Sequence, residues 1–250
     1  MALKILDISK HQPNVDYTAT AKDVDGVILR IGLTYWGAQN MDVDPCFEKH
    51  YAGFKAVGCP VGVYYYSAAD SVAVAQKEAE FCLSLMKGKQ FELPVYYDVE
   101  NNQRQGALSK QTLTDIVETF CSIVEKAGYY VGFYASTSWL YNKMNTDYLK
   151  SKYTLWKADY RTNYDKAIAC DMFQYTSTAS VDGINGNVDL SHCYKDFPSI
   201  ITKAGLNGFG KHVTEETCKE CEKLKAANKQ LEAELAVYKK KVDDILEILK

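Results

Sequence analysis

The sequence has neither an excess of basic residues nor a long apolar run, and each absence excludes a class of function. Lys and Arg total 29 against 32 Asp and Glu, a formal net charge of −3, so neither nucleic acid nor an anionic membrane is an expected partner. No stretch approaches the roughly 18 apolar residues of a membrane span. The first residues show no charged segment followed by an apolar one, so we expect synthesis in the cytoplasm without a signal peptide.

A disulfide framework and a histidine cluster are also missing. Cys218 and Cys221 form a single CxxC pair without a second one, so we expect no zinc there, although the pair could cross-link two chains. The four His include no His-x₃-His pair, and we expect neither a metal nor a cofactor. The other six Cys are scattered singly and are expected to be free thiols of a reducing compartment: Cys46, Cys59, Cys82, Cys121, Cys170 and Cys193.

What the sequence does contain is a regular succession of strand-like runs. Apolar and aromatic segments recur between turn residues, and the first five are separated by stretches long enough for a helix. The eight predicted strands are Leu3–Ser9, Gly26–Gly32, Val61–Ser67, Leu93–Glu100, Val131–Ser136, Thr154–Ala158, Asp171–Tyr175 and Asn187–Leu190.

This pattern predicts an α/β fold. Repeated βα units favour a parallel sheet, and eight strands favour a closed barrel with its site at the C-terminal strand ends. We therefore predict an irregular TIM-like barrel of five βα units followed by three β-strands. An open doubly wound sheet is the alternative, but no Gly-rich phosphate loop follows any of the predicted strands.

Two carboxylates end the fourth predicted strand. Asp98 and Glu100 are separated by one residue, so strand alternation places them on the same face. Glycoside cleavage uses such a pair, because it needs one protonated and one ionised carboxyl. We expect the Asp98 charge and the apolar packing of the strand to raise the pKa of Glu100.

Two further acids are predicted at the same rim of the barrel. Asp7 ends the first strand and Asp189 ends the last, and these strands are neighbours in a closed barrel. A capping or salt-bridging role is the alternative for either acid alone, and binding of Ca²⁺ or Mg²⁺ is the alternative for the cluster. Strand alternation adds aromatic residues that either line a sugar-binding groove or fill the barrel: Tyr64, Tyr66, Tyr134 and Trp156.

The composition changes near the C-terminus. Residues 214–250 contain no Gly or Pro and carry two apolar rows with a period of seven, Cys221-Asn228-Leu235-Val242-Leu249 and Leu224-Leu231-Tyr238-Ile245. These rows predict a coiled coil, and the single Asn228 favours a parallel dimer in register. The alternatives are a higher oligomer, or one amphipathic helix packed on the barrel. We predict a catalytic barrel over 1–206, a linker over 207–213 and an oligomerisation helix over 214–250.

An ordered set of motifs over residues 3–200 resembles glycoside hydrolase family 25, the muramidase family of many phage endolysins. The matching segments are Asp7–His11, Val27–Arg30, Gly62–Ser67, Pro94–Glu100, Gly132–Ser136, Leu155–Tyr160, Phe173–Ser177 and Gly183–Asp189.

The resemblance implies hydrolysis of the β-1,4 bond between N-acetylmuramic acid and N-acetylglucosamine in peptidoglycan. By position, Glu100 matches the general acid, and Asp98, Asp7 and Asp189 match the other active-site acids. Gln174 joins the aromatic residues as an expected substrate contact, and the expected place of action is the bacterial wall after release during phage lysis. A non-catalytic glycan-binding barrel on a coiled-coil oligomer remains the alternative.

Overall fold

A computed structural model describes residues 2–35, 40–210, 228–231, 234–235 and 238–239. The chain divides into two compact units, Met1–Gly210 and Lys211–Lys250. The strands are β1 (Leu3–Ile8), β2 (Gly26–Thr34), β3 (Met41–Val43), β4 (Val61–Tyr66), β5 (Val95–Asp98), β6 (Val131–Ser136), β7 (Thr154–Ala158), β8 (Met172–Ala179) and β9 (Val188–Cys193). The helices are α1 (Tyr17–Asp23), α2 (Phe47–Ala56), α3 (Val72–Met86), α4 (Asn102–Gln105), α5 (Lys110–Lys126), α6 (Thr137–Asn142), α7 (Thr146–Lys150) and α8 (Phe197–Ala204).

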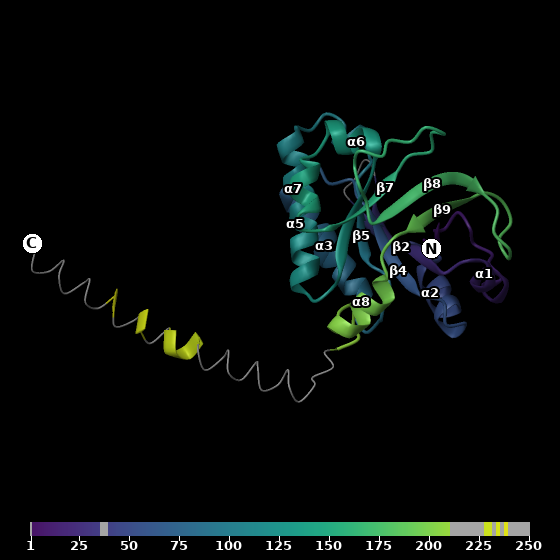
Figure 1. Cartoon of the computed structure of the whole chain (residues 1–250), viewed down its shortest axis with the longest axis horizontal. Helices are drawn as coiled ribbons and strands as arrows, with labels where there is room; N and C mark the ends of the chain where they lie inside the picture. The colour runs from purple at the N-terminus through teal and green to yellow at the C-terminus, as the bar shows by residue number, and fades with distance from the viewer. Residues whose placement is uncertain (1, 36–39, 211–227, 232–233, 236–237, 240–250) are drawn as a thin grey trace, which may run out of the picture. The chain divides into compact units, whose positions relative to one another are not determined.

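Eight of these strands close into a barrel surrounded by helices (Figure 1). They follow the order β1-β9-β8-β7-β6-β5-β4-β2, and pairing of β1 with β2 completes the circle. The predicted closed eight-stranded barrel is therefore confirmed. Strand β3 was not predicted; it pairs antiparallel with the end of β2 outside the ring, and three residues are too few to show a period in the sequence.

The last strand runs antiparallel to its neighbours, unlike the parallel strands predicted for the βα units. Strand β9 pairs antiparallel with both β1 and β8. The cause is the tight connection from β8, where Gly183 and Gly186 adopt φ of 87° and 96°, a left-handed backbone that glycine adopts without steric cost. Asp189 consequently lies near the start of its strand rather than at its end.

Two apolar layers hold the barrel together. The interior contains Ile5, Ile28, Tyr96 and Trp156, while a larger outer layer joins the strands to the helices. Gly132 makes room for this filling, because a Cβ there would lie 2.3 Å from the Thr154 carbonyl oxygen and 2.8 Å from the Tyr96 ring. A glycine on β6 is thus a requirement of interior packing.

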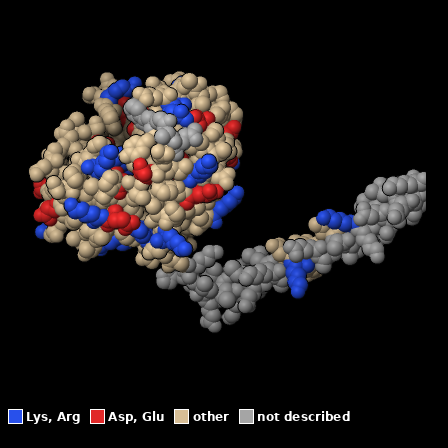
Figure 2. Space-filling view, turned by 180° about the vertical axis from the view of Figure 1, so that it is seen from behind, with Lys and Arg blue, Asp and Glu red and all other residues tan. Residues whose placement is uncertain are grey.

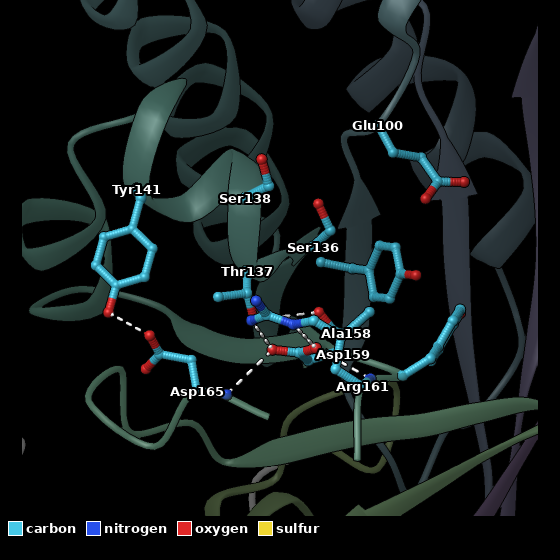
Figure 3. Close-up of a pocket in the computed structure, with 11 residues that line it drawn as sticks. Glu100, Ser136, Thr137, Ser138, Tyr141, Ala158, Asp159, Arg161 and Asp165 are labelled. Atoms are coloured by element: carbon cyan, nitrogen blue, oxygen red, sulfur yellow. Dashed lines mark hydrogen bonds and ion pairs between the residues drawn. The ribbon is translucent and has the colours of Figure 1, made fainter. Parts of the chain in front are cut away.

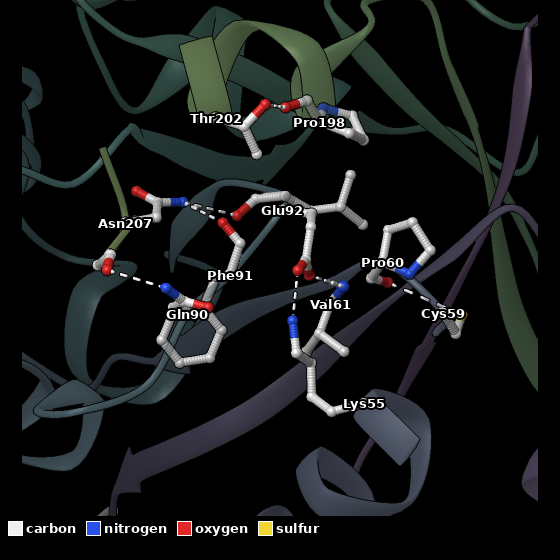
Figure 4. A network of polar contacts seen from close by, with 12 residues as sticks. Lys55, Cys59, Pro60, Val61, Gln90, Phe91, Glu92, Pro198, Thr202 and Asn207 are labelled. Atoms are coloured by element: carbon white, nitrogen blue, oxygen red, sulfur yellow. Dashed lines mark hydrogen bonds and ion pairs between the residues drawn. The ribbon is translucent and has the colours of Figure 1, made fainter. Parts of the chain in front are cut away.

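The segment after α8 closes the end of the barrel opposite the acids. Asn207 is fully buried, and its side-chain amide donates to the carbonyls of Phe91 and Leu93 at 3.0 and 2.9 Å (Figure 4). Its Oδ1 accepts from the Tyr130 amide at 2.6 Å. Asn207, the first residue of the predicted linker, is a hydrogen-bonded part of a unit that extends to Gly210.

A second polar contact supports the same end of the barrel. Glu92 forms an ion pair with Lys55 of α2, and its other oxygen accepts from the Val61 amide at 3.1 Å (Figure 4). These contacts connect the N-terminal ends of β4 and β5, at the end of the barrel opposite the acids.

The six cysteines within the described residues are unpaired, four of them buried and two half-buried; Cys218 and Cys221 lie outside those residues. Acidic and basic side chains are interspersed over the face of the barrel unit seen in Figure 2. Among the described residues, no helix is long and apolar enough to cross a membrane.

The predicted coiled coil lies mostly outside the described residues. Those of its residues that are described, 228–231, 234–235 and 238–239, are helical. Leu231, Leu235 and Tyr238 of the predicted apolar rows are exposed.

Candidate active site

A cavity of about 130 Å³ opens at the C-terminal ends of the parallel strands. It is lined by all nine residues that the sequence nominated, together with one that it did not, Arg30. The lining consists of Asp7, Arg30, Tyr64, Tyr66, Asp98, Glu100, Tyr134, Trp156, Gln174 and Asp189.

Strand β5 delivers two of the acids. Asp98 is its last residue and lies opposite Tyr66 of β4 and Tyr134 of β6. Val99 is buried and continues the ladder, its amide donating to the Tyr134 carbonyl at 3.1 Å. Glu100 therefore comes back to the cavity side, as period-two alternation predicts. Glu100 lies at the cavity mouth and is exposed, whereas Asp98 is buried.

The other two acids face each other across β1 and β9. Asp7 and Asp189 are register partners, so the predicted proximity is correct. The reason for this proximity differs from the prediction. Because β9 is antiparallel to β1, the start of β9 and not its end lies at the rim with Asp7. Gln174 of β8 bridges the pair, its Nε2 donating to Asp7 at 2.9 Å and reaching Asp189 at 3.4 Å.

The same glutamine anchors two tyrosines. Its Oε1 accepts from the hydroxyl of Tyr134 at 2.8 Å and from that of Tyr160 at 2.6 Å. The amide nitrogen of Gln174 thus contacts the acids and its amide oxygen contacts the tyrosines. These contacts fix the position of its side chain. Tyr160 was not nominated from the sequence; its place directly after β7, in the segment Leu155–Tyr160, is the signal that could have found it.

Restricted hydration in the cleft raises the pKa of all four carboxyls. It raises the pKa of Asp189 to about 6. It raises the pKa of Asp7 well above its ordinary value, and the Asp189 charge adds to the rise while the hydrogen bond from Gln174 opposes it. Two carboxyls this close in a restricted space resist double ionisation.

The pair on β5 behaves similarly, with a cation in opposition. Burial raises the pKa of Asp98 well above its ordinary value, the charges of Glu100 and Asp7 add to this, and Arg30 lowers it. The pKa of Glu100 is also raised, as predicted, but by the restricted hydration of the cleft and then by Asp189. The sequence argument had assigned that second contribution to Asp98.

Aromatic rings form the wall between the acids. Trp156 packs against Tyr134 with ring centroids 4.7 Å apart, and against Tyr64 at 6.3 Å in an edge-on arrangement. The Trp156 indole N–H donates to Ser191 at 3.0 Å. The ring is therefore held in one orientation at the floor of the cavity.

A larger cavity of about 730 Å³ adjoins the first one and shares Glu100 and Tyr134 with it. Figure 3 shows its walls, which come from the segments after β6 and β7. Arg161 makes a two-pronged contact with Asp159 at 2.8 and 2.6 Å, which holds the pKa of Asp159 well below its ordinary value. Tyr141 donates to Asp165 at 2.9 Å (Figure 3). Glu100 thus stands between a narrow acidic cavity and a wide one with polar and aromatic walls.

A buried polar network supports the acid pair from behind β5. Glu78 of α3 accepts from the hydroxyls of Tyr97 at 2.5 Å and Ser67 at 2.8 Å. Gln105 donates to Ser67 at 3.1 Å and accepts from the Asn101 amide at 3.1 Å. The network connects α3 to the backbone that follows the acids, and all five side chains are buried.

The described residues contain no group of three or more His, Cys, Asp and Glu side chains arranged to hold a metal ion. The chemistry that this site can perform with its own side chains is proton transfer and stabilisation of positive charge.

Comparison with known proteins places these features in a family. The model of the family described as "Glycosyl hydrolases family 25" matches residues 6–184. The "Autolytic lysozyme" of Clostridium acetobutylicum is 28% identical over 194 residues, which are 75% of this chain and 55% of that protein.

Two solved structures are also similar. The modular autolysin LytC from Streptococcus pneumoniae, in complex with a synthetic peptidoglycan ligand, is 27% identical with a TM-score of 0.67, over 77% of this chain and 47% of the other. The CTP1L endolysin is 28% identical with a TM-score of 0.68, over 80% and 69%. The chain thus spans about half the length of LytC and of the clostridial lysozyme.

Proposed function

The chain belongs to glycosyl hydrolase family 25, and we propose that it is a lysozyme acting on peptidoglycan. The bond cleaved is the β-1,4 linkage between N-acetylmuramic acid and N-acetylglucosamine. One observation carries the proposal: Glu100 lies where a cavity lined by four acids meets a wider cavity. A glycan occupying both cavities would have a glycosidic oxygen beside this carboxyl.

Glu100 is the general acid in this proposal. Its raised pKa favours the protonated form that a general acid needs. Glu100 gives that proton to the leaving oxygen as the bond to the anomeric carbon breaks, and the resulting carboxylate then takes a proton from the attacking water.

Asp98 stabilises the positive charge that develops at the anomeric carbon. It does so either as a nucleophile or by orienting the 2-acetamido group of the substrate for internal attack. The neighbouring Arg30 charge, which lowers the pKa of Asp98 against the effect of its burial, supports a role for the ionised form. Asp7 and Asp189, which are register partners on β1 and β9, complete the acid cluster. The Asp189 charge helps to hold the pKa of Glu100 high.

The aromatic residues and Gln174 are proposed to hold the sugars. Tyr64, Tyr66, Tyr134 and Trp156 line the cavity, and aromatic rings together with tyrosine hydroxyls are a combination that sugars bind. The hydrogen bonds of Gln174 to Asp7 and Tyr134 support an additional positioning task.

The test compares Glu100→Gln with the wild-type chain on purified peptidoglycan. Release of reducing ends should fall about 10²–10⁴-fold, with an unfolding midpoint no lower than that of the wild type. Glu80→Gln, an exposed site on α3, is the control and should retain full activity. Mass spectrometry of the fragments should show N-acetylmuramic acid at the new reducing end. A wild-type chain that binds walls without releasing fragments would contradict the proposal and favour a glycan-binding barrel.

We also propose that residues 214–250 associate the chain into a parallel dimer. The exposure of Leu231 and Leu235 on a helical segment supports this, since apolar rows of this kind are buried in a coiled coil. Sedimentation of the full chain should give twice the monomer mass, and a chain ending at residue 213 should sediment as a monomer. Equal masses per chain in the two samples would refute the dimer.

The proposed place of action is the bacterial cell wall, reached during phage lysis. In this proposal the protein reaches the wall from within the cell through a separate membrane lesion. Lysis from within of cells expressing the chain, dependent on co-expression of a pore-forming protein, would support this placement.

A further inference from the structure

Glu78 is a buried acid that the proposed reaction does not use. It lies on α3, and its side chain is fully buried. Its Oε2 accepts from the hydroxyls of Tyr97 at 2.5 Å and Ser67 at 2.8 Å, and its Oε1 accepts from the Ala68 amide at 3.2 Å. A buried carboxyl is costly unless its oxygens are paired, and here both oxygens are paired with groups close to the active site.

These contacts fix the residue that precedes Asp98. The Tyr97 ring points away from the cavity and stacks on Phe120 of α5, with centroids 3.9 Å apart, while its hydroxyl is held by Glu78. Neighbouring residues of a strand point to opposite faces, so a fixed Tyr97 directs Asp98 into the cavity. The backbone amide of Ser67 adds a hydrogen bond to the Asp98 carbonyl at 3.0 Å.

The same network fixes the residue that follows Glu100. The Asn101 amide donates to Oε1 of Gln105 at 3.1 Å, and Nε2 of Gln105 donates to the Ser67 hydroxyl at 3.1 Å. That hydroxyl in turn donates to Glu78. The backbone that carries the two acids is therefore held on both sides, and both attachments lead to Glu78.

We propose that Glu78 is a positioning residue for the two acids of the β5 segment. It acts through Tyr97 and Ser67 on the backbone that carries both acids, and it does not line the cavity. This inference rests on the proposed function, because it concerns the placement of the proposed general acid. Proton transfer needs that acid within hydrogen-bond reach of the leaving oxygen, so a displacement of Glu100 on the order of 1 Å slows hydrolysis.

The two oxygens of Glu78 serve different donors, which explains why an acid occupies this position. One oxygen accepts from two hydroxyls and the other accepts from a backbone amide. A glutamine has only one accepting oxygen, and its NH₂ group is a donor. It would turn that donor toward either the hydroxyls or the amide. Glu78→Gln therefore preserves the volume of the side chain and disrupts its hydrogen bonds.

The test compares Glu78→Gln with the wild-type chain on soluble peptidoglycan strands. The kcat for release of reducing ends should fall about 10–100-fold with an unchanged KM, because the acids move while the aromatic lining of the cavity stays in place. Glu80→Gln, the same substitution at an exposed position of α3, is the matched control and should change neither constant. Asn207→Ala, at the opposite end of the barrel, controls for lost stability and should keep its kcat at a temperature where it is fully folded.

Hydrogen exchange measures the same placement without catalysis. Mass spectrometry should show faster exchange of the backbone amides of residues 98–106 in Glu78→Gln, and unchanged exchange of these amides in Asn207→Ala. If Glu78→Gln loses cooperative unfolding, Tyr97→Phe removes one donor to Glu78 and gives the same comparison.

Several results would overturn the inference. They are an unchanged kcat, a raised KM in place of a lowered kcat, an equal loss of kcat in Asn207→Ala, and unchanged exchange over residues 98–106. Faster exchange in Glu78→Gln, in a chain whose wild type cleaves no peptidoglycan, would uphold the placement of the acids by Glu78 and refute only the proposed function.

Discussion

The substitution Asp189→Asn should stabilise the protein at neutral pH. Asp189 is partly buried opposite Asp7, and burial raises its pKa from 3.8 to about 6. A carboxyl whose pKa is higher in the folded state binds a proton there more tightly than in the unfolded chain. Stability is therefore lost as the pH rises from about 4 to about 6, and it stays reduced above that range.

The size of the gain follows from the same shift. A rise from 3.8 to about 6 corresponds to roughly 3 kcal/mol of unfavourable ionisation free energy in the folded state. Because Asp189 keeps part of its hydration, we take about half of this value and expect a gain of about 1–2 kcal/mol. The asparagine side chain also lacks the negative charge by which Asp189 raises the pKa of Asp7.

Urea denaturation at pH 8 and at pH 4 measures this effect. The gain should be present at pH 8 and largely absent at pH 4, where the wild-type carboxyl is protonated in the folded state. Asp182→Asn, in the exposed connection before β9, is the control and should show no such pH dependence. A variant no more stable than wild type at pH 8, or equally stabilised at both pH values, would refute this account of the cluster.

The substitution should also move the pH profile of hydrolysis. The Asp189 charge contributes to the raised pKa of Glu100, so its removal should shift the alkaline limb of the profile to lower pH. An alkaline limb that does not move would show that Asp189 does not influence the proposed general acid.

Two further substitutions test the scaffold. Asn207→Ala removes both amide donors to Phe91 and Leu93 and should lower the free energy of unfolding by about 2–4 kcal/mol, measured by urea denaturation; a loss below about 1 kcal/mol would contradict it. Gly132→Ala places a Cβ 2.3 Å from the Thr154 carbonyl and should cost about 1–3 kcal/mol through strand displacement. An unchanged thermal midpoint for Gly132→Ala would show that the barrel interior is less tightly packed than described.

Most of the barrel could be predicted because its strands carry local signals. Two strands have the same bounds in the prediction and in the structure, Val131–Ser136 and Thr154–Ala158. Both are short apolar runs whose ends are marked by turn residues. Met41–Val43 could not be predicted, because three residues, two of them exposed, are too few to show a period. The hydrogen bonds of Asn207 could not be predicted either, because its partners lie more than 70 residues away in sequence.

The candidate site also contains residues that could be predicted from the sequence and one that could not. Asp98 and Glu100 were recognisable as a pair, because alternation along one strand is a local property. Arg30 was not nominated as a site residue. A single cation in an apolar strand does not indicate a site until the fold shows that it lies near Asp44 and Asp98.

By itself, the sequence determined the strands, the acid pair on the fourth run and, through its ordered motifs, the family. Tertiary structure alone decided how the four carboxyls affect one another. The antiparallel return of β9 sets Asp189 opposite Asp7, and closure of the barrel withdraws water from both. The physical reason is that side-chain direction follows from local backbone geometry. Desolvation, charge coupling and an unpaired donor such as Arg30 Nη2 depend instead on what the fold brings near.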